Sequence, residues 1–196
     1  MDELEKYWKG RYDSEKTGWD IGYPSTPLKE YFDQLENKDI SILIPGAGNA
    51  YEAAYLWNQG FKNVHIIDIV AEVIDSFLNN NPSFPKENAH HGDFFKHDSD
   101  YDLIIEQTFF CSFPPLKETR MLYAKKMASL LVPAGKLVGL WFNFPLKDDM
   151  EKRPFGGAKE EYLSYFSPHF SLCSMEECYN SIEPRRGSEL WGTFTK

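Results

Sequence analysis

The sequence has few cysteines and no long apolar run. Only 3 of its 196 residues are cysteines, and none forms a Cys-x-x-Cys pair. Cys173 and Cys178 have no histidine or cysteine at the spacing of zinc ligands, so we expect neither a disulfide framework nor a metal site. No stretch is long and apolar enough to span a membrane, and the chain begins with acidic and polar residues. We therefore expect a cytoplasmic protein without a membrane partner.

Basic residues are also in deficit. Lysine and arginine number 21 and aspartate and glutamate number 30, which gives a formal charge of 21 − 30 = −9. Such a chain repels a phosphate backbone, and no basic run offsets the total, so nucleic acid is not an expected partner. With 42% hydrophobic and 16% aromatic residues, the chain can build one sizeable core. We expect a single domain over residues 1–196, monomeric, with a small molecule as its partner.

One stretch indicates a ligand-binding turn. Residues 40–45 are mostly aliphatic on both faces, as in a buried strand of a parallel sheet. Gly46 and Gly48 follow and permit a sharp turn with close approach to a ligand. Residues 49–59 then have the apolar spacing of a helix that ends before Gly60. A strand, a glycine turn and a helix form the nucleotide-binding corner of a doubly wound α/β fold.

The residues missing from this corner restrict its ligand. A dinucleotide fingerprint needs a third glycine, but Tyr51 stands in its place, and the Gly-Lys-Ser/Thr ending of a phosphate loop is absent. Asp68 closes the next apolar run, twenty residues after Gly48, where a carboxylate can accept hydrogen bonds from both hydroxyls of a ribose. Together these features favour S-adenosylmethionine over NAD. A structural turn next to a surface aspartate is the alternative interpretation.

The N-terminal segment is rich in aromatic rings. Trp8 and Tyr12 are four residues apart and would share one face of a short helix, and Trp19 lies in a following loop with glycines and a proline. Aromatic faces attract a sulfonium cation, and methyl transfer profits from the exclusion of water. We therefore interpret residues 1–38 as an aromatic lid on a Rossmann-like core of residues 39–196. Simple coverage of the core explains the rings equally well.

The remaining patterns complete a doubly wound sheet. His90 and His91 are adjacent on a short strand and would point to opposite faces, which argues against a metal site. Gln107 and Phe109 leave the fourth strand at the carboxyl edge of the sheet, beside the expected ligand. We predict a seven-stranded, mostly parallel sheet with a C-terminal antiparallel pair, from helices at residues 27–35, 72–78, 116–131 and 159–166 and strands at residues 64–68, 89–95, 101–111, 136–144, 170–176 and 189–194.

These residues resemble the thiopurine S-methyltransferase-like family, which includes the thiol and halide methyltransferases of plants. The resemblance is carried by Trp8, Tyr12 and Trp19, Ile44 to Gly48, Asp68, residues 92–95, 102–104 and 108–111, residues 154–157 and residues 185–189. It implies a class I methyltransferase fold and S-adenosylmethionine as the cofactor, with S-adenosylhomocysteine as the product. It assigns the three rings to a lid over the cofactor, Gly46 to its methionine end, Asp68 to the ribose, Asp93 and Phe94 to the adenine, and Gln107 to a further contact. Gly48 and Ile69 are further candidates for cofactor binding.

The acceptor is less well defined by the sequence. Tyr12 and Gln107 depart from the residues common in the family, and no triad that could deprotonate a hydroxyl or amine is evident. Phe113 and Leu116 replace the polar and aromatic residues that flank two prolines in enzymes that methylate base amines, which disfavours base flipping. We therefore expect a thiol, thiopurine, selenide or halide, with no obligatory catalytic residue.

The expected acceptor pocket is apolar with nearby positive charge. We place Phe109, Phe110, Trp141 and Phe144 in its wall, because such rings favour soft, polarizable acceptors. Arg153, Arg185 and Arg186 are candidates that would stabilise a thiolate. Two alternatives stay open from sequence: an NAD-dependent oxidoreductase and an inert domain that only binds S-adenosylmethionine.

Overall fold

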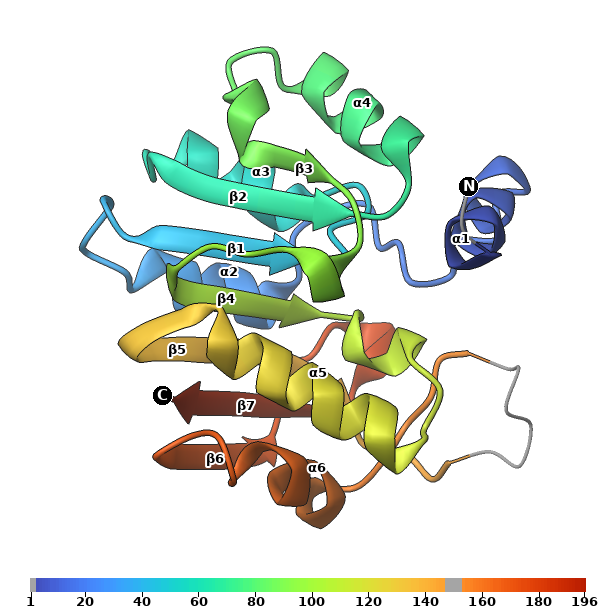
Figure 1. Ribbon diagram of the computed structural model, residues 1–196, viewed down its shortest axis with the longest axis vertical. Coiled ribbons are helices and arrows are strands. Elements are labelled where there is room, and N and C mark those ends of the chain that lie inside the picture. Colours follow the sequence, from blue (N-terminus) through green and yellow to red (C-terminus); the bar gives the residue numbers. More distant parts are fainter. Residues whose placement is uncertain (1–2, 147–152) are drawn as a thin grey trace.

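A computed structural model describes residues 3–146 and 153–196. Its centre is a seven-stranded sheet in the order β3-β2-β1-β4-β5-β7-β6 (Figure 1). Strands β1 to β5 pair in parallel, and β7 runs antiparallel to both of its neighbours, β5 and β6. The predicted doubly wound sheet with a C-terminal antiparallel pair is thus confirmed. The strands are β1 Ser41–Pro45, β2 Asn63–Asp68, β3 Ala89–His91, β4 Tyr101–Gln107, β5 Leu131–Phe142, β6 Leu172–Glu177 and β7 Glu189–Thr195.

Helices cover both faces of the sheet. One apolar cluster joins α2, α3 and α4 to one face, and a second joins α5 and α6 to the other. Strand β1 shows why both faces are filled: Ile42 and Ile44 belong to the first cluster and Leu43 to the second, as expected when successive side chains alternate. The helices are α1 Glu3–Asp13, α2 Thr26–Asp33, α3 Tyr51–Asn58, α4 Ala71–Asn80, α5 Lys117–Ser129 and α6 Lys159–Phe166, with short 3-10 turns η1 Lys86–Asn88, η2 Phe94–Lys96, η3 Phe110–Ser112 and η4 Glu183–Arg185.

Two predicted boundaries differ from the structure. Residues 133–135, which follow the helix predicted over residues 116–131, lie inside β5, because the helix ends at Ser129 and Leu131 already pairs with Tyr101 across a register shift. The third predicted strand is reduced to three residues, and Asp93 instead caps η2 by accepting a hydrogen bond from the Phe95 amide at 2.9 Å. Both errors occur where local polar contacts or strand pairing override apolar patterning.

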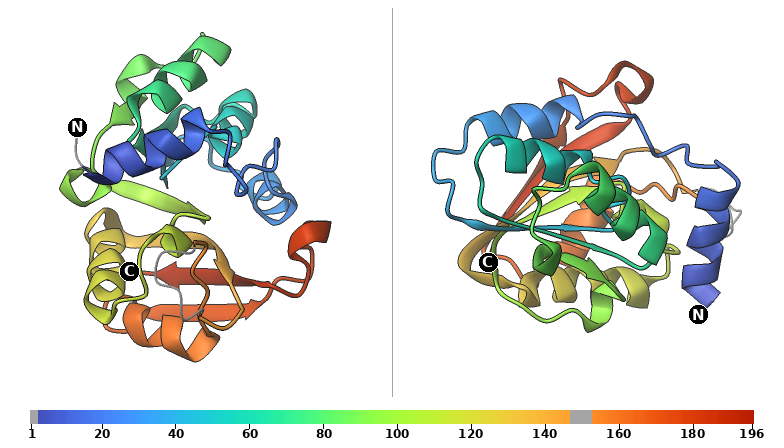
Figure 2. Two further views of the ribbon diagram at one scale, coloured as in Figure 1. Left: turned by 90° about the vertical axis from the view of Figure 1, so that its right-hand side faces the viewer. Right: turned by 90° about the horizontal axis from the view of Figure 1, so that it is seen from above.

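Helix α1 lies apart from the sheet, beyond the carboxyl ends of β1 and β2 (Figures 1 and 2). None of its residues is fully buried. It therefore adds little to the core and instead covers the edge at which ligands bind in this class of fold. Among the residues that the structure describes, no helix is long and apolar enough to cross a membrane.

Candidate functional site

A cavity of about 420 Å³ opens at the carboxyl ends of the strands. Its floor comes from the turns that follow β1, β2, β3 and β4 and from the end of β5, and its cover comes from α1 and the loop after it. The lining consists mainly of aromatic and small residues: Leu4, Tyr7, Trp8, Arg11, Tyr12, Gly18, Trp19, Gly46, Ile67, Asp68, Ile69, Gly92, Asp93, Phe94, Phe95, Thr108, Phe109, Cys111, Ser112, Phe113, Phe142, Arg153, Pro154, Pro184 and Arg185.

The glycine turn after β1 is built as the sequence predicts. Gly46 and Gly48 have φ values of 59° and 53°, in the left-handed region that favours glycine. A Cβ atom on Gly46 would lie 2.1 Å from Cδ2 of Phe109, so this position also lacks room for a side chain. Gly48 does not line the large cavity, but a smaller hollow behind it that it shares with Gln107.

Asp68 lies at the end of β2 and is only 7% exposed. Its two carboxylate oxygens accept hydrogen bonds from the amides of Gly48 and Val70, each at 3.0 Å. Burial raises the pKa of Asp68 above its usual value, and these amide hydrogen bonds oppose that rise. Each carboxylate oxygen has a second lone pair, so the residue is oriented from behind and can still accept bonds from a ligand.

The three N-terminal rings meet as one unit above the glycine turn. Trp8 and Tyr12 each pack edge-to-face on Trp19, with ring centroids 5.4 and 5.5 Å apart. The Tyr12 hydroxyl lies 3.1 Å from the position that a Cβ atom of Gly48 would take. The rings predicted as a lid therefore line the cavity together, and Tyr12 reaches Gly48, about 36 residues later in the sequence, because the chain folds back over the turn.

The adenine-side candidates lie together on the opposite rim. Ile69, Asp93 and Phe94 all line the cavity next to Asp68. Asp93 is fixed by its bond to the Phe95 amide, and the ring of Phe94 stands edge-to-face on Phe109 at 5.2 Å. The second carboxylate oxygen of Asp93 can accept a hydrogen bond from an adenine amine, and the ring of Phe94 offers a flat apolar surface for the adenine ring.

Gln107 ends β4 and faces the smaller hollow beside Gly46 and Gly48. Its side-chain carbonyl oxygen is buried and has no hydrogen-bond partner within the described chain. Because a buried acceptor without a donor is unfavourable, this oxygen points to a ligand group that donates hydrogen bonds.

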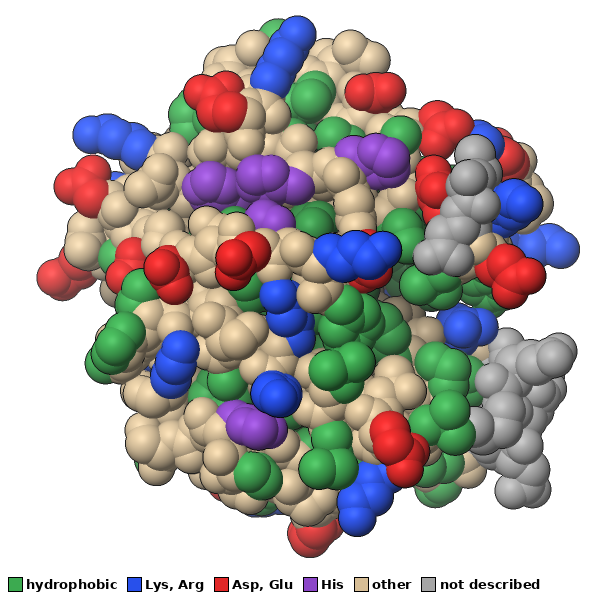
Figure 3. All heavy atoms as spheres, viewed as in Figure 1, with side chains coloured by type: hydrophobic (Ala, Val, Ile, Leu, Met, Phe, Trp, Pro, Cys, Tyr) green, Lys and Arg blue, Asp and Glu red, His purple; other side chains and the backbone are tan. Residues whose placement is uncertain are grey.

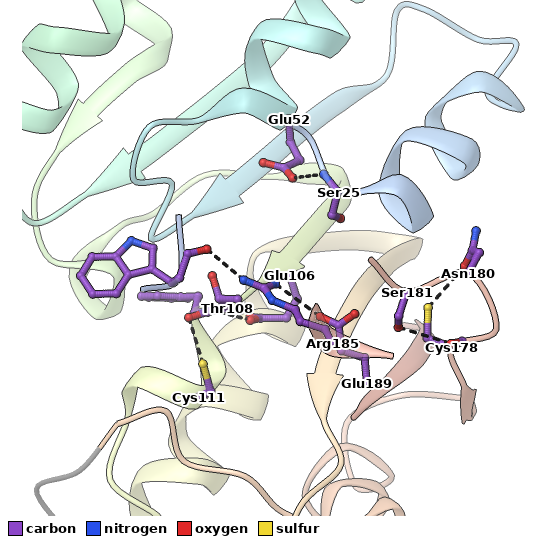
Figure 4. Close-up of polar contacts among 12 residues, drawn as sticks. Ser25, Glu52, Glu106, Thr108, Cys111, Cys178, Asn180, Ser181, Arg185 and Glu189 are labelled. Carbon is purple, nitrogen blue, oxygen red and sulfur yellow. Dashed lines mark hydrogen bonds and ion pairs between the residues drawn. The ribbon is translucent and has the colours of Figure 1, made fainter. Parts of the chain in front are cut away.

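The arginine candidates separate into two groups. Arg153 and Arg185 line the cavity, whereas Arg186 lies outside it and pairs with Glu183 on the surface at 2.7 Å. Arg185 is 8% exposed and donates hydrogen bonds to Glu189 and to the carbonyl of Trp19, so it ties the lid to β7 (Figure 4).

Arg153 has a different environment. Its Nε donates to the Ser112 carbonyl at 2.7 Å, and its guanidinium lies over the rings of Tyr7 and Trp8, 4.5 and 5.5 Å from their centroids. Among the described residues it has no carboxylate within ion-pair distance. Its charge is therefore available at the cavity wall.

The predicted aromatic acceptor pocket is only partly correct. Phe109 lines the large cavity, but Phe110 and Trp141 are buried beneath it against a small adjacent void. Phe144 bridges to Gly157 and is not among the lining residues. The position of Phe110 differs from the prediction because η3 follows Phe109 and turns Phe110 into the core.

Several lining residues were not identified from sequence: Arg11, Cys111, Phe142 and Pro184. Phe142 and Pro184 belong to the last strands and loops, and only the folded sheet brings them to the glycine turn. Cys111 follows the predicted crevice residues directly, so its position after Phe109 was an available signal. Burial raises the pKa of the Cys111 thiol, and the same effect raises the pKa of the Tyr12 hydroxyl.

Histidines lie elsewhere. His65, His90 and His97 form a cluster over β2 and β3, where Figure 3 shows histidine side chains gathered on one face. His91 points the other way and contacts the carbonyl of Ile69, as strand alternation predicts. In residues 3–146 and 153–196, no group of three histidine, cysteine, aspartate or glutamate side chains is arranged to hold a metal ion.

Comparisons with known proteins agree with this geometry. The structure of the 1,6-didemethyltoxoflavin-N1-methyltransferase of Burkholderia thailandensis, solved with S-adenosylhomocysteine, has a TM-score of 0.76, 16% identity and coverage of 98% of this chain and 87% of that chain. The fold is therefore that of class I S-adenosylmethionine-dependent methyltransferases.

The sequence comparisons are more specific. The probable thiol methyltransferase 2 of Arabidopsis thaliana is 26% identical over 197 residues, which cover 96% of this chain and 84% of that protein. The thiocyanate methyltransferase 1 of the same plant is 28% identical over 198 residues, again 96% and 84%. The model of the thiopurine S-methyltransferase family matches residues 4–195, so the chain belongs to that family. It is an S-adenosylmethionine-dependent methyltransferase of small nucleophiles, and the oxidoreductase alternative is set aside.

Proposed function

We propose that this enzyme methylates small, soft nucleophiles that reach the cavity as anions, namely thiolates and halides. The observation that carries the proposal is the set of ionisable groups in the cavity lining. Among the described residues that line it there are three arginines, and the only carboxylates are Asp68 and Asp93, both on the rim that we assign to the cofactor. Within residues 3–146 and 153–196, no histidine, lysine or glutamate lines the cavity, so the described part of the acceptor side carries positive charge and none of the usual basic side chains.

Two further ionisable groups of the lining, Cys111 and Tyr12, are poorly suited to act as a base. Cys111 and Tyr12 line the cavity, but burial raises the pKa of both groups, so each stays protonated near neutral pH. A hydroxyl or amine acceptor would need a group that removes its proton. A thiolate or halide needs none, because it is already anionic. The thiol and thiocyanate methyltransferases of Arabidopsis, which have related sequences, support the same acceptor class.

The residues present fit the cofactor. Asp68 offers acceptors for two ribose hydroxyls, Asp93 and Phe94 offer an acceptor and a flat face for adenine, and the unpartnered oxygen of Gln107 suits an ammonium group near the glycine turn. Gly46 leaves the backbone open to close approach. When bound, S-adenosylmethionine supplies an electrophilic methyl group on a sulfonium ion.

The chain's own residues then orient the two reactants, supply positive charge and exclude water. The rings of Trp8, Tyr12 and Trp19 exclude water and present aromatic faces to a cation. Arg153 attracts an anion to the wall next to Phe109 and Phe113, whose rings supply a polarizable surface. Holding two reactants in line accounts for most of the acceleration in such a reaction.

The rate of S-adenosylhomocysteine formation across acceptors tests this proposal. Iodide, bisulfide, thiocyanate, small thiols and thiopurines should be turned over, and catechols and amines should not. With iodide the rate should be flat between about pH 6 and 9, whereas with a thiol it should follow the ionisation of that thiol, near ~8.5 for a simple one. Turnover confined to catechols or amines would refute the proposal.

The position of the lid can be tested separately. If α1 and the loop after it close over the cofactor, S-adenosylhomocysteine should slow proteolysis before about residue 25, since α1 has no fully buried residue to hold it otherwise. Equal cleavage with and without the ligand would show that these rings only cover the core and do not close over the cofactor. We further propose that residues 1–196 act as one monomeric domain in the cytoplasm, which sedimentation and localisation of a tagged protein would check.

A further inference from the structure

A buried carboxylate lies beneath the cavity without an obvious reason for its presence. Glu106 is on β4 in the middle of the sheet and is 0% exposed, next to the apolar residues Ile104 and Ile105. Within the described parts of the chain, no lysine or arginine forms an ion pair with it. Because an unpaired buried carboxylate is strongly unfavourable, its hydrogen bonds must hold something that the protein needs.

Three donors converge on this carboxylate. One oxygen accepts the backbone amides of Phe109 and Phe110 at 2.7 and 2.8 Å, and the other accepts the hydroxyl of Tyr123 from α5. On the neighbouring strand, Gly139 faces Glu106, and a Cβ atom there would lie 2.5 Å from the Glu106 Cβ. The adjacent strand therefore leaves room for the glutamate, and α5 orients it.

The turn held by Glu106 is strained and faces the cavity. Thr108 has a φ of 55°, a left-handed conformation that is rare and unfavourable for a β-branched residue. Figure 4 shows Glu106, Thr108 and Cys111 on this turn, and the Cys111 thiol donates to the Thr108 carbonyl at 3.2 Å. Such a conformation persists only where the surrounding bonds enforce it.

The turn places one ring where the two halves of the site meet. Phe109 lies against Gly46, close enough that a Cβ atom there would be 2.1 Å from its ring. The same ring contacts Phe94 on the adenine side and Phe113 on the acceptor side, at 5.2 and 4.9 Å between centroids. Any shift of the turn would therefore move the surface against which donor and acceptor are aligned.

We propose that Glu106 is a positioning residue: oriented by Tyr123, it holds the amides of Phe109 and Phe110 and so fixes the Phe109 ring between the cofactor and acceptor sides. It does not touch either reactant. The inference rests on the proposed function only for the choice of acceptor in the assay. A displacement of this wall by a fraction of an ångström lowers kcat more than it lowers the affinity for the cofactor, because the alignment of the two reactants is most critical in the transition state.

The variant Tyr123→Phe tests this inference with the smallest change in volume. Tyr101→Phe is the matched control, since it also removes one buried hydroxyl, bonded to His97 at 2.7 Å, from the same apolar cluster. We expect Tyr123→Phe to speed hydrogen exchange of the Phe109 and Phe110 amides about tenfold and to lower kcat with iodide about tenfold. The Kd of S-adenosylhomocysteine should change less than threefold, and the control should change none of the three.

Two substitutions of the carboxylate provide a graded test. Glu106→Gln keeps an oxygen that accepts both amides and should retain most of the exchange protection, whereas Glu106→Ala removes it and should lose the rate as well. Should the alanine variant fail to fold, the glutamine variant and Tyr123→Phe still decide. Equal thermal destabilisation by Tyr123→Phe and Tyr101→Phe, with unchanged amide exchange and kcat, would overturn the proposal. If the enzyme methylates none of the soft acceptors, the proposed function fails, but the exchange data still answer this question.

Discussion

The cavity has two facing walls, which differ in charge and in the segments of the chain that form them. One wall follows strands β1, β2 and β3. The first carries Asp68 and Asp93 and comes from consecutive strand-to-helix turns between Gly46 and Phe95. The second carries Arg153 and Arg185 and is assembled from the turn after β4, the end of β5 and two later loops. We refer to them as the cofactor wall and the acceptor wall.

Under the proposed function, this difference follows from what each wall has to recognise. A cofactor with a ribose and an adenine needs a fixed set of acceptors, and the parallel strands supply them at one edge of the sheet. A small soft anion offers few directional groups, so its wall is made of rings and nearby positive charge. Substitutions that act on one wall should therefore leave the function of the other largely intact.

We expect Asp68→Ala to give the largest difference between its effect on cofactor binding and its effect on acceptor binding. Loss of two charge-assisted hydrogen bonds to the ribose should weaken S-adenosylhomocysteine binding by about 2–4 kcal/mol. Calorimetry measures that loss, and the KM for iodide at saturating cofactor should stay within about twofold. An unchanged cofactor affinity would show that the ribose is held by another residue.

The next largest effect tests the junction between the walls. In Gly46→Ala the added methyl would meet the Phe109 ring at 2.1 Å, and the residue would keep a φ near 59°. We expect the free energy of unfolding to fall by about 2 kcal/mol, from left-handed strain plus overpacking. The double variant with Phe109→Ala should recover only the steric part. Full additivity of the two losses in denaturant unfolding would mean that these residues do not press on each other.

The cofactor wall was predictable because its residues are close in sequence. Gly46, Gly48 and Asp68 occupy fixed offsets from apolar runs, and the parallel sheet converts such offsets into positions. The lid needed more than spacing: Trp8, Tyr12 and Trp19 show an aromatic pattern, but the fold alone decides that they contact the turn after β1.

The acceptor wall was predicted less well, for a physical reason. We placed Phe110 in the cavity wall together with Phe109, but Glu106 accepts the two amides, Thr108 takes a left-handed conformation and η3 turns Phe110 into the core. A buried polar contact, which the sequence pattern does not show, thus decides where these two rings lie. Likewise, Arg185 and Arg186 are adjacent in sequence, yet one is buried against the lid and the other is on the surface.

Removing the charge of Arg153 tests the acceptor wall directly. Arg153→Met keeps an unbranched side chain and should lower kcat/KM for iodide about tenfold, or about 1.4 kcal/mol, with little change in cofactor affinity. Arg186→Met is the matched control, because that guanidinium pairs with Glu183 outside the cavity. Equal losses in both variants would indicate a general effect of net charge, and an unchanged Arg153→Met would remove this residue from the acceptor wall.

The smallest expected effect concerns the strands that support the cofactor wall. His65, His90 and His97 stack over β2 and β3, and burial lowers the pKa of all three, to about 4 for His65. An unfolded chain binds these protons near pH 6.5. The stabilisation that comes from neutral rings is therefore fully present above about pH 6.5 and is lost as the pH falls toward about 4.

The variant His65→Asn isolates that contribution. Between pH 7 and 5, the wild-type protein should lose about 1 kcal/mol more unfolding free energy than the variant, a figure already reduced because these rings are partly solvated. Burial raises the pKa of Glu106 to about 7, which gives the opposite dependence on pH, but this contribution is common to both proteins and cancels in the difference. His169→Asn, outside the cluster, should behave like the wild type. Because Asp68 ends β2 and Asp93 follows β3, amides of residues 89–91 should lose exchange protection in acid before those of β5 and β7, and simultaneous loss would show that the two walls share one unit of stability.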